Sequence, residues 1–140
     1  MKRWQPLVAI PCLSFLAACS LVSRAHREFQ ICAVPEAAFF NDISNTVNQL
    51  GYRASTGTAE DAQGHLTTVM KATRWTTAIW ATNQVVFPAL NQAGGEVIPR
   101  HDAFYISVDG LTSAQVNRAY GSLISKLSHD GYRVSYEPCP

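Results

Sequence analysis

Few side chains of this sequence could exchange a proton or bind a metal, and the four histidines are the first to consider. They are His26, His65, His101 and His129. None belongs to an HExxH segment or to a His/Cys pair with the spacing of a zinc site. His101 and His129 each precede an aspartate, but adjacent residues of a strand point to opposite faces, so neither pair forms a ready acid–base dyad. The histidines therefore predict no metal site and no proton-transfer site.

Motifs of nucleophilic catalysis and of cofactor binding are missing from the sequence. It contains no GxSxG nucleophile elbow, no Walker phosphate-binding loop, no GxGxxG and no CxxC. Its carboxylates are few and scattered. We therefore expect a protein that is not an enzyme and holds no dissociable cofactor.

Charge and composition describe one ordinary globular domain. The 140 residues are 47% hydrophobic and 15% charged, with a net charge of +1. Without Lys2 and Arg3, nine basic residues face ten acidic ones. No basic field remains that could hold phosphate backbones, so nucleic-acid binding is not expected.

The first twenty residues, MKRWQPLVAIPCLSFLAACS, have the layout of a secretory signal. A basic start (Lys2, Arg3) precedes a mostly apolar stretch over residues 4–16, and small residues follow. The stretch is too short to cross a hydrocarbon core comfortably, which takes about 20 apolar residues. The alternative interpretations are an uncleaved apolar anchor and an ordinary secretory signal in which Cys19 is accidental.

The end of this signal, Leu16-Ala17-Ala18-Cys19, resembles the lipobox of bacterial lipoproteins at all four positions. The resemblance implies that a diacylglycerol is joined to the Cys19 sulfur, that the peptide is cut before Cys19, and that the new N-terminus is acylated, for example with palmitate. Two or more chains give stable anchoring, at ~0.8 kcal/mol per buried methylene. Ser20, in place of aspartate, resembles the outer-membrane sorting pattern. We therefore expect a periplasm-facing protein of the outer membrane, with the inner membrane or the cell surface as the alternative.

The remaining cysteines predict a disulfide. Cys12 would leave with the signal and Cys19 would carry lipid, so Cys32 and Cys139 remain as a pair in an oxidising compartment. In the chain-entropy model a bridge closing so long a loop stabilises the fold by up to ~4–5 kcal/mol. Two separate thiols are the alternative.

The chain divides into residues 1–18 (signal), 19–28 (lipidated N-terminus and tether) and 29–140 (one α+β domain). Within this domain, residues 29–56 and 104–137 form a weak internal repeat of strand, helix, Gly-Tyr-Arg and strand. Pro35 suits the first helical position, and Thr112 or Ser113 suits an N-cap. Apolar residues recur at helical spacing in both helices: Phe39, Ile43, Val47 and Leu50, then Val116, Tyr120, Leu123, Ile124 and Leu127.

Two such units predict a ferredoxin-like split β-α-β sandwich, with both helices on one face of an antiparallel sheet. Between the units, the Thr-rich residues 65–87 favour an additional hairpin, with a helical insert as the alternative. Residues 88–100 read as an exposed loop.

The predicted strand order conflicts with the predicted disulfide. A last strand antiparallel to the first would place Cys139 opposite residues 26–28, ~13–20 Å from Cys32. Three resolutions stay open: the Pro138 tail folds back, the strand order differs, or the bridge does not form.

Binding is the function that this sequence favours. Trp75 and Trp80 lie in the Thr-rich segment, and Arg100 and His101 follow the Gly-rich stretch. Trp and Arg are enriched in binding hot spots, although both tryptophans could instead complete the core. We expect a lipid-anchored, non-catalytic interaction module with a protein partner in the cell envelope. Its alternatives are an immunity or inhibitor protein against a toxin or lytic enzyme, and a subunit of an envelope secretion or conjugation assembly.

Overall fold

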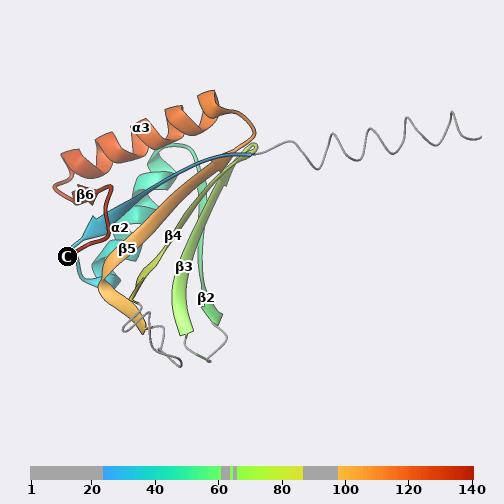
Figure 1. The fold of residues 1–140 in the computed structure, drawn as a ribbon. Helices are drawn as coiled ribbons and strands as arrows, with labels where there is room; N and C mark the ends of the chain where they lie inside the picture. The colour runs from blue at the N-terminus through green and yellow to red at the C-terminus, as the bar shows by residue number, and fades with distance from the viewer. Residues whose placement is uncertain (1–23, 61–63, 65, 87–97) are drawn as a thin grey trace, which may run out of the picture.

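A computed structural model describes residues 24–60, 64, 66–86 and 98–140 of the chain (Figure 1). The elements in chain order are β1 (Ala25–Cys32), α2 (Glu36–Gln49), β2 (Arg53–Glu60), β3 (Leu66–Arg74), β4 (Thr77–Val86), β5 (Ile98–Gly110), α3 (Ser113–His129) and β6 (Arg133–Ser135). The predicted signal, Cys19 and residues 88–97 of the predicted loop lie outside the described residues.

The six strands form one antiparallel sheet in the order β2-β3-β4-β5-β1-β6. The predicted α+β class, with two helices on an antiparallel sheet, is confirmed. The Thr-rich segment is a hairpin, β3 and β4, and not a helix. The first strand lies beside the last, as expected. The ferredoxin-like relationship itself stays a prediction.

Two boundaries differ from the sequence prediction. β1 begins at Ala25, so the last four residues of the predicted tether belong to the sheet. Residues 98–100 open β5 and are not loop. In both cases pairing across the sheet extends the strand: Ala25 pairs with Gly110, and Arg100 pairs with Gln84.

The two helices end in the same way. Gly51 and Gly131 follow α2 and α3 with φ of +92° and +93°, a left-handed conformation that glycine adopts at little cost. The next residue in each case, Tyr52 or Tyr132, donates its backbone N–H back to the helix.

The helix starts differ. Pro35 is the N-cap of α2 and not its first helical residue, whereas Thr112 caps α3 by accepting from the Gln115 N–H at 3.2 Å.

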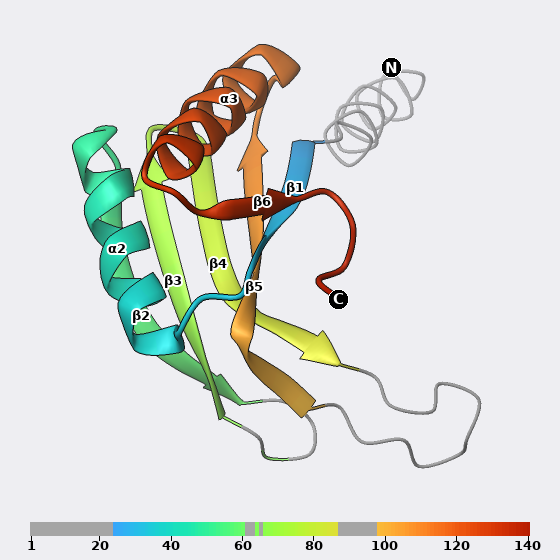
Figure 2. The same cartoon turned by 90° about the vertical axis from the view of Figure 1, so that its left-hand side faces the viewer.

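Both helices lie on the same side of the sheet (Figure 2). The buried core residues come from these helices and from the strands that they cover. Alternate residues of β1 and β5, such as Phe29 and Phe104, point to this side and are buried. Phe39 of α2 stacks on Phe104 with ring centroids 4.0 Å apart. The strands bury one face under the helices, so their intervening residues face the other way.

Candidate interaction surface

The face of the sheet opposite the helices is not covered by any described helix. Residues on this face pair across the strands in three rows. They are Arg53-Thr73-Ala78-Asp109-His26, Ser55-Lys71-Trp80-Ser107-Glu28 and Gly57-Val69-Thr82-Tyr105-Gln30-Ser135. We call these residues the open face. Its aromatic, hydroxyl and charged groups differ from the apolar face under the helices.

Trp80 lies in the middle row of the open face, where its side chain is only partly covered. The residue is 37% exposed, and the Lys71 ammonium lies 4.7 Å from the centroid of its ring. A cation–π interaction of this kind stabilises the contact by about 0.5–1 kcal/mol at exposed sites. Trp80 is therefore not a core residue, and it presents an aromatic surface beside a positive charge.

A hydrogen-bonded group of side chains crosses β1 and β5 on the open face. His26 bonds through Nδ1 to Asp109 and through Nε2 to Glu28, the latter at 3.0 Å. The Tyr105 hydroxyl donates to the same Glu28 carboxylate. The pKa of His26 is raised above its ordinary 6.5 by its hydrogen bond to Asp109 and then by that to Glu28.

Sequence reasoning missed this group. It considered each histidine with its chain neighbours, whereas Asp109 and Tyr105 come from a strand about eighty residues away. The available signal was the two-residue spacing of His26 and Glu28, which puts both on one face of a strand.

The structure does not bring together the four residues that were predicted to form one binding surface. Trp75 and Trp80 lie on the β3–β4 hairpin, with Trp75 in its turn. Arg100 and His101 lie near the start of β5, at the far end. Arg100 bonds to Asp102 and to the Cys139 carbonyl, the latter at 3.1 Å.

His101 points toward the helices and bonds to Glu36 at the start of α2. Burial raises the pKa of Glu36, but hydrogen bonds, that from His101 foremost, outweigh burial and leave the pKa below its ordinary value. This contact joins β5 to α2. The His101 side chain itself is exposed, and it lies away from both tryptophans.

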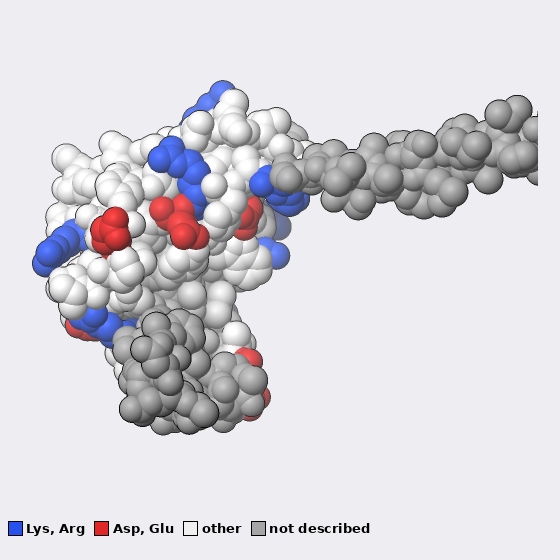
Figure 3. Space-filling model, in the orientation of Figure 1, with Lys and Arg blue, Asp and Glu red and all other residues white. Residues whose placement is uncertain are grey.

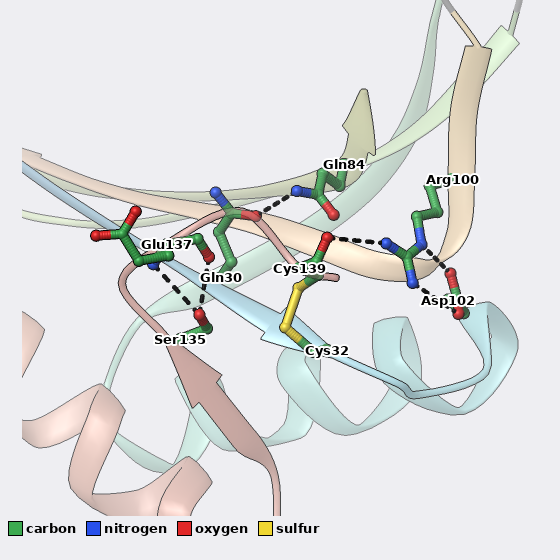
Figure 4. The surroundings of a disulfide bond; sticks show 8 residues. All are labelled: Gln30, Cys32, Gln84, Arg100, Asp102, Ser135, Glu137 and Cys139. Carbon is green, nitrogen blue, oxygen red and sulfur yellow. Dashed lines mark hydrogen bonds and ion pairs between the residues drawn. A yellow bond between two sulfur atoms is a disulfide. The ribbon is translucent and has the colours of Figure 1, made fainter. Parts of the chain in front are cut away.

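Cys32 and Cys139 are joined by a disulfide, with their Cα atoms 5.6 Å apart (Figure 4). β6 pairs Ser135 with Gln30, so a straight strand would have carried Cys139 away from Cys32. Instead the chain turns after Ser135, whose hydroxyl accepts from the Glu137 N–H and donates to the Glu137 carbonyl. Of the three resolutions that the sequence left open, the structure shows that the tail folds back.

The described residues contain no group of three or more His, Cys, Asp and Glu side chains placed to hold a metal ion. Among the described helices, none has the length and apolar character needed to cross a membrane.

No protein-family model, curated protein or solved structure matches this chain.

Proposed function

We propose that this protein is a lipid-anchored, non-catalytic interaction module of the bacterial cell envelope, whose open face binds a protein partner. The observation that carries the proposal is the open face itself, which spans six strands and holds Trp80 beside Lys71. Aromatic residues are enriched in the cores of protein interfaces.

The backbone of the open face favours binding because it is fixed before a partner arrives. Each central strand is hydrogen-bonded on both sides, and the helices pack beneath it. A surface that is already ordered loses less conformational entropy on association. Opposite charges on the same face, Lys71 and Glu28, would select the partner by charge complementarity.

Two features support the proposed cellular location. They are the lipobox resemblance at Cys19 and the Cys32–Cys139 disulfide, since disulfides form and persist in oxidising compartments. We place the protein at the outer membrane, facing the periplasm. The test is Cys19→Ser in cells fed a fatty-acid probe. We expect loss of labelling and release from the membrane fraction, and unchanged labelling would refute the lipid anchor.

The partner is tested by crosslinking and capture from envelopes with a matched pair of variants. Thr73→Arg changes an exposed side chain on the open face, and Ser125→Arg changes an exposed side chain on the outer surface of α3. We expect one protein to be recovered with the native chain and with Ser125→Arg, and to be lost with Thr73→Arg. Equal recovery with both variants would exclude the open face.

The identity of the recovered partner separates the narrower forms of this proposal. A toxin or lytic enzyme would indicate an inhibitor, and a component of a secretion or conjugation machine would indicate an assembly subunit.

A further inference from the structure

Several segments meet at the end of the domain where the described chain begins. Arg24 donates from Nη2 to the Thr76 carbonyl in the β3–β4 turn at 2.8 Å. Ala25, the first residue of β1, pairs with Gly110 at the end of β5. The C-terminal end of α2 and the first turns of α3 lie at the same end of the sheet (Figure 1). We call this region the entry end.

Two large apolar side chains are exposed at the entry end. Trp75 is 91% exposed in the β3–β4 turn, and Leu111 is 49% exposed between β5 and α3. Trp75 also has a φ of +55°, in the left-handed region where a bulky residue is strained by about 1–3 kcal/mol. Almost none of its ring is buried by the described residues, so packing within the domain does not offset this strain.

The charge of the entry end is positive. Arg24, Arg74 and Arg118 are exposed there, and no carboxylate of the described residues pairs with any of them. Asp109 is the acidic residue nearby, and it is already bonded to His26. Basic side chains are visible at the right of Figure 3, where the described chain begins.

A hollow of about 280 Å³ opens between the β3–β4 turn and the two helices. Arg74, Trp75 and Arg118 line it together with Thr77 and Gln115. Arg74 also donates to the Leu50 carbonyl at the end of α2, which holds its guanidinium at the rim. Guanidinium groups and a hydroxyl around an apolar ring suit an anionic headgroup attached to hydrocarbon.

We propose that the entry end docks on the anionic phospholipid surface to which Cys19 is anchored, with Trp75 and Leu111 at the interface and the arginines on lipid phosphates. This inference rests on the lipid anchor of the proposed function. Only five residues separate Cys19 from Ala25, a span of about 20 Å when extended. The tether therefore keeps the entry end, and not the far end of the sheet, next to the bilayer.

Docking would arise because weak contacts of Trp75 and the arginines with lipid headgroups add to the membrane attachment that the lipid anchor provides. Tryptophan favours the headgroup level because its ring is apolar and its N–H is polar. Each arginine near an anionic surface contributes about 1 kcal/mol, which corresponds to about fivefold in partitioning. Docking would fix the tilt of the domain and leave the open face directed along the membrane surface.

The test uses the non-lipidated chain from Ser20 to Pro140, which contains every described element and both disulfide cysteines. Trp80→Phe leaves Trp75 as its single tryptophan, and Trp75→Asn leaves Trp80. With phosphatidylglycerol vesicles, we expect Trp75 emission to shift to the blue and to be quenched by brominated lipid, and Trp80 emission to stay unchanged. Phosphatidylcholine vesicles should bind about tenfold or more weakly, because they carry no net charge.

Matched leucines provide the control. Leu111→Ser removes an exposed leucine from the entry end, and Leu66→Ser removes one that is 66% exposed at the far end. We expect Leu111→Ser to weaken binding to anionic vesicles several-fold and Leu66→Ser to leave it unchanged. Arg118→Gln should weaken it by about fivefold.

Equal quenching of both tryptophans, unchanged binding of Leu111→Ser and Arg118→Gln, or no binding to anionic vesicles would overturn docking. Loss of an envelope protein with Trp75→Asn, without any vesicle binding, would overturn it in favour of a protein partner. If docking is overturned but Cys19→Ser abolishes lipid labelling, the proposed lipid anchor still stands. If Cys19→Ser leaves the labelling unchanged while Trp75 still enters anionic vesicles, the proposed lipid anchor is wrong and the proposed docking surface stands.

Discussion

His26 and Asp109 are cross-strand partners whose side chains bond on the open face. Glu28 bonds to the other ring nitrogen of His26, so an imidazolium would lie between two carboxylates. This arrangement makes the strength of the β1–β5 contact depend on pH.

Replacing His26 with Gln should destabilise the protein more at pH 6 than at pH 8.5. Because the pKa of His26 is raised on folding, its contribution is complete below the unfolded value of 6.5 and disappears as the pH rises through the folded value. The free energy of unfolding of both proteins in urea measures the difference. Ser55→Ala, which changes an exposed side chain on the same face outside this group, is the control. The prediction would be contradicted if His26→Gln lowered the free energy of unfolding by the same amount at both pH values.

Removing the Cys32–Cys139 bridge should lower the free energy of unfolding by about 2–5 kcal/mol, because its loss frees a loop of 107 residues in the unfolded chain. The measurement is urea unfolding of the Cys32→Ser/Cys139→Ser variant. Dithiothreitol should destabilise the native chain to the same level and should not affect the variant. Equal stability of the native chain with and without reductant would show that the bridge contributes nothing.

Trp75→Gly should stabilise the fold by about 0.5–1 kcal/mol, since glycine adopts a φ of +55° without strain and the exposed ring loses few contacts, while the greater freedom of glycine in the unfolded chain offsets part of the gain. Trp75→Val should destabilise it, because a β-branched residue is poorly suited to that conformation. Thermal or urea unfolding distinguishes the two. If glycine proves destabilising, the ring must make contacts that the described residues do not show.

Thr112→Ala should cost about 1 kcal/mol, because the hydroxyl accepts the Gln115 N–H at the start of α3. Ser113→Ala, one residue later and also exposed, should leave the free energy of unfolding within about 0.5 kcal/mol. The sequence allowed either residue as the cap. Equal effects of the two variants would contradict the observed cap.

Local patterns in the sequence predicted the elements that are fixed by local chemistry. The helical spacing of Phe39, Ile43 and Val47 and the glycine after each helix gave α2 and α3 nearly their observed extents. The Thr-rich composition favoured the β3–β4 hairpin. Strand ends were predicted less well, because Ala25 is held in β1 by Gly110 and not by its own neighbours.

The predicted surface of Trp75, Trp80, Arg100 and His101 shows the limit of reasoning along the chain. The residues are close in sequence, but β4 runs the length of the sheet before β5 returns, and this separates the two pairs. Register then places Arg100 on the side of Cys139 and His101 on the side of Glu36. Residues that are near one another in the sequence can therefore lie at opposite ends of a long strand.

By itself, the sequence determined the α+β class and the approximate extents of the two helices, and it singled out Cys32 and Cys139 as a pair, because helix capping, side-chain periodicity and cysteine number are local or compositional properties. Only the tertiary structure decided that the tail turns back to close the disulfide, that His26 meets Asp109, and that Trp75 stands exposed beside Arg24 where the chain enters the sheet. These relationships depend on strand order and register, which are set by packing the whole core and cannot be read from one segment.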